Sequence, residues 1–146
     1  MQPNARLLVP VPPEGLLDDV LDALAALGPA QVELLAVAPA QTRLNPHTTL
    51  PDPAFEEARW GEDRREAERI LEKIRVSSRA VSRHVERGEP AEQIVARALD
   101  GEFDFIVMAT RGNTGLRRMM LGSVTDQVVR NAPCPVVVVP PQGKKA

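Results

Sequence analysis

Short apolar runs alternate with longer segments of helical periodicity along the chain, and this alternation limits the possible folds more than any other feature. Each apolar run predicts a buried strand. The runs are residues 5–11, 32–37, 105–109 and 136–139. Val81 and Val85 alternate with polar residues and predict a further, half-exposed edge strand. Strands that are apolar throughout are typical of a parallel sheet with both faces covered, so the chain is predicted to form one open, five-stranded α/β sandwich with right-handed connections.

Four helices are predicted between these strands, from apolar residues that recur every three or four positions. Their apolar faces comprise Leu17, Val20, Leu21, Leu24 and Leu27, then Ala67, Ile70, Leu71 and Ile74, then Ile94, Val95, Ala98 and Leu99, and finally Val124, Val128 and Val129. Gly28 and Pro29 end the first helix, and Pro90 opens the third. Ser123 is predicted to be the N-cap of the fourth.

Two residues are expected to disturb this regular pattern. Pro10 lacks a backbone donor, so the first strand is predicted to fray or bulge at its end. Gly61 is predicted to break or fray the second helix near Trp60. Residues 40–53 contain three prolines and no periodicity, and they predict a long surface loop.

Charged residues in the second helix are predicted to form a solvated face. Opposite charges three positions apart predict the pairs Glu62–Arg65, Glu66–Arg69 and Glu72–Arg75. The formal charge of the whole chain is only −2, which argues against nucleic acid or an anionic membrane as a partner.

Composition excludes several further classes of protein. One cysteine and two histidines give a metal site few ligands, and an aromatic content of 3% argues against base-stacking surfaces. No Ser-His-Asp set or catalytic carboxylate pair can be assembled, so no catalytic residue is predicted. No signal peptide or membrane span is visible, and a reducing cytoplasm is the expected location. One domain is expected over residues 1–141, followed by a polar tail at 142–146.

The segment after the fourth strand, residues 108–125, is the most informative for function. It contains three glycines, followed by a helix N-terminus, and no acidic residue between Thr110 and Val124. Glycines let backbone amides approach a ligand, and a helix N-terminus attracts anions, so the segment is a candidate phosphate-binding loop. It matches neither the P-loop nor the dinucleotide fingerprint. The alternative is a tight connection whose glycines only permit turns.

The same segment resembles the hallmark of the universal stress proteins, G-x2-G-x9-G-[ST]. Gly112 is followed by nine residues and then by Gly122-Ser123, while Ala109 stands in place of the first glycine. The resemblance extends from Val124 to Val139 and covers most of the chain. Further matching segments are residues 8–11, 34–37 and 88–90.

This resemblance implies a Rossmann-like fold of the adenine nucleotide alpha hydrolase type, with strand order 3-2-1-4-5. It also implies a homodimer in which the strands Val136–Val139 pair across a two-fold axis, and an ATP site, with Mg²⁺, across the ends of strands one, two and four. Val37 and Met108 would line the adenine and ribose, and Ala109 would contribute backbone. The implied phosphate-binding residues are Gly112, Gly122, Ser123, Val124 and Thr125.

The sequence departs from the family pattern at two positions. A methyl group at Ala109 is compatible with ordinary strand dihedral angles. Pro12 occupies the place where ATP-binding relatives have an acid, and only Glu14 or Asp18 could substitute. Two hypotheses therefore stay open, a nucleotide-responsive signalling dimer in which ATP orders the loop from Ala109 to Ser123, and a nucleotide-independent interaction dimer. A slow ATP hydrolase is a third, weaker hypothesis.

The remaining chemically distinctive residues have structural interpretations. His47 and His84 are predicted to be surface residues, and Met119 and Met120 to be packing residues. Cys134 is interpreted as a small packing residue, with a redox thiol as the alternative. Arg117 and Arg118 are equally compatible with phosphate contacts and with solvated charges.

Overall fold

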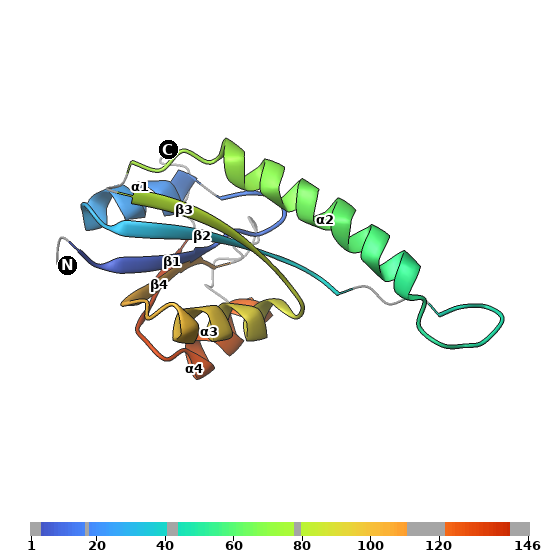
Figure 1. The fold of residues 1–146 in the computed structure, drawn as a ribbon. Helices are drawn as coiled ribbons and strands as arrows, with labels where there is room; N and C mark the ends of the chain where they lie inside the picture. Colours follow the sequence, from blue (N-terminus) through green and yellow to red (C-terminus); the bar gives the residue numbers. More distant parts are fainter. Residues whose placement is uncertain (1–3, 17, 41–43, 78–79, 111–121, 141–146) are drawn as a thin grey trace, which may run out of the picture.

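The computed structural model describes residues 4–16, 18–40, 44–77, 80–110 and 122–140. Five parallel strands form one sheet in the order β3-β2-β1-β4-β5, with helices on both faces (Figure 1). The predicted fold class and the strand order implied by the family resemblance are confirmed. The elements are β1 (Arg6–Pro10), α1 (Asp18–Leu27), β2 (Gln31–Ala38), α2 (Pro53–Lys73), β3 (Ala80–Arg87), α3 (Pro90–Asp100), β4 (Phe105–Ala109), α4 (Ser123–Asn131) and β5 (Val136–Val139).

The central strand β1 divides the core into two layers. Leu7 and Val9 belong to a cluster that includes Val20 of α1 and Leu71 of α2. Leu8, on the opposite face of the same strand, belongs to a second cluster. That cluster includes Ile94 of α3 and Val128 of α4. Side chains of a strand alternate between the two faces of a sheet, so an apolar strand buries one residue in each layer in turn.

Pro10 has a smaller effect on β1 than predicted. It lies in register opposite Leu35, and the amide of Val11 donates to the Leu35 carbonyl at 2.7 Å, so the pairing with β2 shows no bulge. Backbone directions alternate along a strand, so the missing donor of Pro10 faces β4. Within the described strands, β1 pairs with β4 at Leu7 and Leu8, and this pairing ends before the proline.

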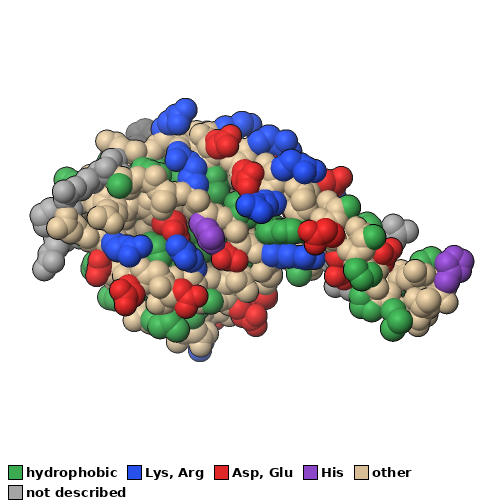
Figure 2. Space-filling view, in the orientation of Figure 1, with side chains coloured by type: hydrophobic (Ala, Val, Ile, Leu, Met, Phe, Trp, Pro, Cys, Tyr) green, Lys and Arg blue, Asp and Glu red, His purple; other side chains and the backbone are tan. Residues whose placement is uncertain are grey.

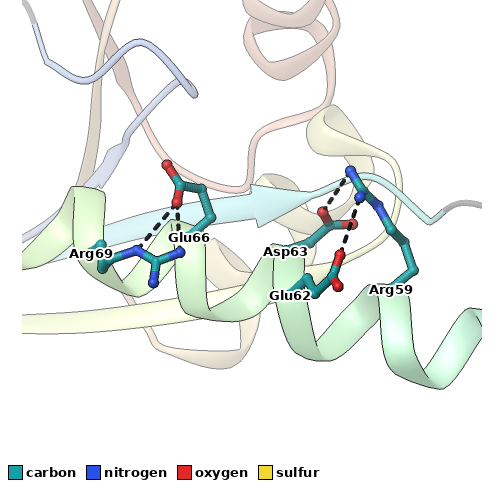
Figure 3. A network of polar contacts seen from close by, with 5 residues as sticks. All are labelled: Arg59, Glu62, Asp63, Glu66 and Arg69. Carbon is teal, nitrogen blue, oxygen red and sulfur yellow. Dashed lines mark hydrogen bonds and ion pairs between the residues drawn. The ribbon is translucent and has the colours of Figure 1, made fainter.

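Helix α2 passes through Gly61 without a break, so the predicted break is wrong. A single glycine costs a helix only about 1 kcal/mol relative to alanine. Packing of Ala67 and Leu71 in the core and a capping bond from the Phe55 amide to the Asp52 carboxylate (3.4 Å) favour the continuous helix. Arg59 also bridges the glycine, because its guanidinium pairs with Glu62 at 3.3 Å and with Asp63 at 3.2 Å (Figure 3).

The outer face of α2 carries exposed ion pairs, as the sequence predicts. The predicted pair Glu66–Arg69 is present at 2.8 Å, whereas Glu62 pairs with Arg59 instead of Arg65 (Figure 3). Arg75 lies beyond the end of the helix at Lys73, so the predicted Glu72–Arg75 pair does not span a helical turn. Exposed pairs of this kind contribute about 0–1 kcal/mol each, which fits a solvated face.

The long loop predicted before α2 is present, and its described part extends away from the sheet together with the first turns of the helix (Figure 1). An antiparallel bridge between Leu44 and Pro51 closes it at its base. Among the described residues, no helix is long and apolar enough to cross a membrane.

The edge strand β3 stabilises the C-terminal end of α2 through one side chain. The guanidinium of Arg83 donates to the carbonyls of Leu71 and Ile74, each at 2.9 Å. The last carbonyls of a helix lack intrahelical partners and carry a partial negative charge, so a cation here serves as both donor and counter-charge.

We expect Arg83→Met to lower the free energy of unfolding by about 1–2 kcal/mol, because two carbonyls lose a charged donor. Urea denaturation followed by circular dichroism measures this change. Arg64→Met is the matched control, since Arg64 forms an exposed pair with Glu68 and its loss is expected to change stability by less than about 0.5 kcal/mol. Equal effects of the two substitutions would show that Arg83 is not a helix cap.

Candidate functional site

The predicted site residues gather where β2 and β4 end and α4 begins. The hydroxyl of Thr125, in the first turn of α4, donates to the Ala109 carbonyl at the end of β4 at 3.2 Å. Val37 and Val124 both pack against the core cluster that contains Met108. The structure therefore brings these predicted residues to one edge of the sheet. Gly112 and the other residues of 111–121, including Arg111, Arg117, Arg118, Met119 and Met120, lie outside the described residues.

Helix α4 has an N-terminus without a side-chain cap. Its N-cap is Gly122, with φ −62° and ψ 159°, and not Ser123, so the predicted cap is wrong by one residue. The Asp126 amide donates to the Gly122 carbonyl at 2.9 Å, which places Ser123 inside the first helical turn. Ser123 is exposed there, and no side-chain oxygen caps the first amides of the helix within the described chain.

The other helix N-termini differ in a way that bears on anion binding. The Glu89 carboxylate caps α3 by accepting from the amides of Ala91 (3.3 Å) and Glu92 (2.8 Å). Asp52 caps α2, and α1 begins with two aspartates. Carboxylates at these positions use the free amides and repel anions. Of the three helices whose N-cap the structure describes, α4 is thus the one whose first amides have no carboxylate cap and are open to an anionic ligand.

Val37 and Met108 differ in how much of the side chain a ligand can reach. Val37 is half-buried at the end of β2. Met108 is only 6% exposed and packs in the cluster with Leu8, Leu35 and Val128. A ligand at this edge would consequently meet the side chain of Val37 and mainly the backbone of Met108. The role of both residues in binding adenine and ribose stays a prediction.

A tight turn follows β1 at the position where the family resemblance implies an acidic residue. The amide of Gly15 donates to the Pro12 carbonyl at 2.9 Å, and the positive φ of Gly15 (92°) is a conformation that glycine adopts without strain. Pro12 is half-buried and offers neither a donor nor a carboxylate. Glu14 and Asp18, the predicted substitutes, are both exposed.

Thr110 is a residue of this edge that the sequence interpretation missed. It follows β4 directly, its amide donates to the Val139 carbonyl at 3.1 Å, and the residue is only 2% exposed. Its hydroxyl has no hydrogen-bond partner among the residues that the structure describes. The only sequence signal was its position, a polar residue immediately after a buried strand.

The two histidines are surface residues, as predicted. His47 is exposed in the loop before α2, and the Nε2 atom of half-buried His84 lies 2.7 Å from Oε1 of Glu86. In the described ranges, no group of three or more His, Cys, Asp or Glu residues is arranged to hold a metal ion.

A groove of about 200 Å³ lies away from this edge, between α2 and β3. Most of the residues that line it are charged, with both signs present: Arg64, Glu68, Glu72 and Arg83. Figure 2 shows basic and acidic groups mixed along α2. Arg64 and Glu68 pair with each other and Arg83 caps α2, so three of these four charged groups already have structural partners, and the lining points to no particular ligand.

Cys134, between α4 and β5, is half-buried and packs against the second core cluster. Burial, and next the negative charge of Asp104, raise the pKa of its thiol above the usual value, although a backbone hydrogen bond with Ile106 partly offsets this effect. A higher pKa means less thiolate at neutral pH, and the thiolate is the reactive form. These features favour the packing interpretation over a redox thiol.

We expect the folded protein to react with iodoacetamide at pH 7.5 at least several-fold more slowly than the urea-unfolded chain, because folding raises the thiol pKa and restricts access. The labelling rate of each form should increase with pH until the thiol is fully ionised. The folded protein should reach this plateau at a higher pH than the unfolded chain. Mass spectrometry of the alkylated chain measures both rates. Faster labelling of the folded form would contradict the packing role.

Comparison with known proteins shows to which family the chain belongs. The model of the universal stress protein family matches residues 4–140. The chain belongs to the universal stress protein family. It is 44% identical over 78 residues to universal stress protein MJ0531 of Methanocaldococcus jannaschii, a match that covers 51% of this chain and 46% of the relative. It is 38% identical over 96 residues to a universal stress protein of Thermus aquaticus, covering 62% and 66%. The chain thus spans less than two thirds of these relatives' length.

Solved structures agree with the fold over nearly the whole chain. The hypothetical protein MJ0577 of Methanocaldococcus jannaschii is 26% identical, with a TM-score of 0.73, over 97% of this chain and 99% of that one. A universal stress protein family protein from Arabidopsis thaliana with AMP bound shares the fold at 16% identity and a TM-score of 0.58, covering 94% and 92%. The universal stress protein from Archaeoglobus fulgidus in complex with dAMP does so at 19% and 0.54, covering 94% and 99%.

Proposed function

We propose that this universal stress protein is a nucleotide-responsive binding module that holds ATP, with Mg²⁺, at the carboxyl edge of its sheet. The observation that carries the proposal is the uncapped N-terminus of α4 beside the end of β4. Adenine nucleotides bound to two structural neighbours of the same family support it. The bound nucleotide would change the surface that the protein presents to another protein.

Different residues of this edge would contact different parts of the nucleotide. The phosphates would lie at Gly122, Ser123, Val124 and Thr125, whose amides begin α4, and Ala109 would contribute backbone. Val37 and Met108 would face the adenine and ribose, while Gly112 would complete the phosphate site from outside the described residues. The described part of this edge places no unpaired carboxylate beside the α4 N-terminus, since Asp126 pairs with Arg130 at 3.0 Å. Mg²⁺ would therefore be held mainly by phosphate oxygens and water, as is usual for this ion.

We expect Gly122→Asp to weaken the binding of Mg·ATP at least about tenfold, since the new carboxylate would cap α4 and repel phosphate. Stability should stay equal or increase slightly, because aspartate is a good N-cap. Isothermal titration calorimetry and thermal unfolding measure the two effects. Gly122→Asn is the matched control, because it caps without charge and should weaken binding less. Undiminished binding in both variants would contradict the proposed phosphate position.

The turn at Pro12 favours a second candidate function, a dimeric interaction protein that needs no nucleotide. Pro12 and Pro13 provide no carboxylate where nucleotide-binding relatives are expected to have one. Denaturing the purified protein and separating released nucleotide by chromatography distinguishes the two functions. Co-purified adenine nucleotide would count against the second candidate.

The dimer would form through β5, which is an edge strand of the sheet. The carbonyls of Pro135 and Val139 accept from β4, so by alternation the backbone amide of Val138 faces away from β4. An apolar edge strand with unpaired amides is a template for pairing, and a second copy of β5 would cover it. We also propose a cytoplasmic location, which suits a single free cysteine, and one domain over residues 1–141 with a polar tail at 142–146.

We expect Val138→Pro to convert the dimer to a monomer, because proline removes an outward donor while leaving the ladder to β4 intact. Light scattering coupled to gel filtration measures the mass, which should halve, and circular dichroism should remain unchanged. Val137→Pro is the contrasting variant, since alternation points its amide toward β4 and its replacement should destabilise the fold itself. A wild-type protein that is monomeric, or a Val138→Pro variant that stays dimeric, would exclude this interface.

A further inference from the structure

The loop before α2 and the first half of this helix project from the sheet as an arm, which comprises residues 44–63 (Figures 1 and 2). Every residue from 44 to 66 is exposed or half-buried, and the first buried residue of α2 is Ala67. Leu44 and Leu50 are 56% and 63% exposed, so the arm presents apolar side chains to solvent. The helical part of the arm, residues 53–63, is short enough to be only marginally stable in water without tertiary packing. A partner would therefore stabilise it.

The charge of α2 changes sign between the arm and the segment that packs on the sheet. The arm contains five acidic side chains and one arginine, whereas residues 64–75, the inner segment, contain five basic and three acidic side chains. The net charges are thus −4 and +2. Attraction to the helix dipole acts only within the first and last turns, so it does not account for a change of sign along the whole helix. From this complementarity we propose that the arm binds the inner segment of a second copy of the chain, with the two α2 helices antiparallel.

Two charged residues, Glu57 and Arg65, fix the register of this contact. Both are exposed, and neither forms an ion pair within the described chain, in contrast to Arg59 and Arg69 (Figure 3). They lie about 12 Å apart along the helix axis, which is too far for a pair within one copy. Gly61 lies midway between them, in the same row of residues spaced four apart. A two-fold axis at Gly61 would place each Glu57 opposite Arg65 of the other copy, so both ion pairs would form together.

Side-chain size also matches in this register. Ala54 and Ala58 of the arm would lie opposite Glu68 and Arg64 of the second copy, so small residues would meet long ones. At the axis itself, the atom nearest to an added Cβ on Gly61 would be Nη1 of Arg65 of the same copy, at 3.7 Å. The surface at Gly61 is therefore open to a second helix.

The same register accounts for the exposed leucines of the arm. The face of α2 that carries Gly61 continues to Glu68 and Glu72, which line the groove between α2 and β3. With the axis at Gly61, the first helical residue, Pro53, would lie opposite Arg69 of the second copy, and the loop before it would extend over this groove (Figure 1). The two exposed leucines of that loop would then be covered by the second copy.

This contact is separate from the dimer proposed through β5. Helix α2 packs on β2 and on β3, which is the edge strand opposite β5 in the sheet. A contact between two helices and two short loops belongs to the smallest class of specific interfaces, of about 1,000 Å² or less, and such interfaces are weak. Dimers joined through β5 would therefore associate further through α2 only at high protein concentration.

Charge reversal in the Val138→Pro variant tests the contact, because this variant isolates α2 from pairing through β5. Sedimentation equilibrium at up to about 1 mM protein should show the mass rising toward that of two chains. Glu57→Arg and Arg65→Glu should each weaken this association about tenfold, since like charges then face each other at two places. The double variant Glu57→Arg/Arg65→Glu should recover the affinity to within about threefold, because both pairs are restored with exchanged signs. Circular dichroism should show unchanged helix content in all variants.

Arg130→Glu is the matched control, because it changes the net charge as Arg65→Glu does but lies on α4, where Arg130 forms an exposed pair with Asp126. It should leave the association unchanged to within about twofold. Absence of association at the highest concentration would overturn the proposal. Equal weakening by Arg130→Glu and Arg65→Glu, or a double variant no better than the single ones, would also overturn it. The same series in the wild type gives the same ranking whether or not β5 pairs, so failure of the β5 dimer is distinguishable from failure of this contact.

Discussion

Burial of β1 on both of its faces is the constraint on which the rest of the structure depends. Leu7, Leu8 and Val9 are at most 1% exposed, so helices must cover the sheet on each side. The helix after β1 covers one face and the helix after β4 covers the other, because α1 and α4 contribute to different core clusters. The connections that follow the neighbouring strands β1 and β4 consequently lead to opposite faces of the sheet. Such a divergence opens a crevice at the carboxyl edge of a sheet, where ligands bind in open α/β folds.

Charged groups fix the amino edge of the sheet. Glu33 of β2 accepts two hydrogen bonds from the Arg97 guanidinium of α3, both at 2.7 Å, and this contact raises the pKa of Arg97. Arg97 and Arg6 both lie over the ring of Phe103, at 5.9 and 5.0 Å. A paired, bidentate contact of this kind fixes the position of α3 on the sheet, because separating the partners would leave a largely buried carboxylate alone.

The hydrophobic pattern was sufficient to predict the strands and helices. It was not sufficient where the effect of a single residue depends on its tertiary contacts. The five strands and four helices follow from runs and spacings that extend over many residues. The break at Gly61 is not found because Ala67 and Leu71 anchor α2 in the core, which the sequence does not show. The N-cap of α4 was predicted one residue too late, at Ser123 instead of Gly122, since glycine is also an acceptable N-cap. The site residues came from the family motif, whereas Thr110 could be found only from its burial.

Two unfavourable features lie near the end of β4, namely the uncapped N-terminus of α4 and the unpaired hydroxyl of Thr110. The described helices α2 and α3 have carboxylate caps, whereas the N-cap of α4 is Gly122, which has no side chain. Buried side-chain atoms without partners in the described chain are Nε of Arg59 and the hydroxyl of Thr110. The Arg59 guanidinium is otherwise paired with Glu62 and Asp63, so only Thr110 lacks compensation. Free amides at a helix N-terminus attract an anion, which fits the phosphate position proposed at the start of α4.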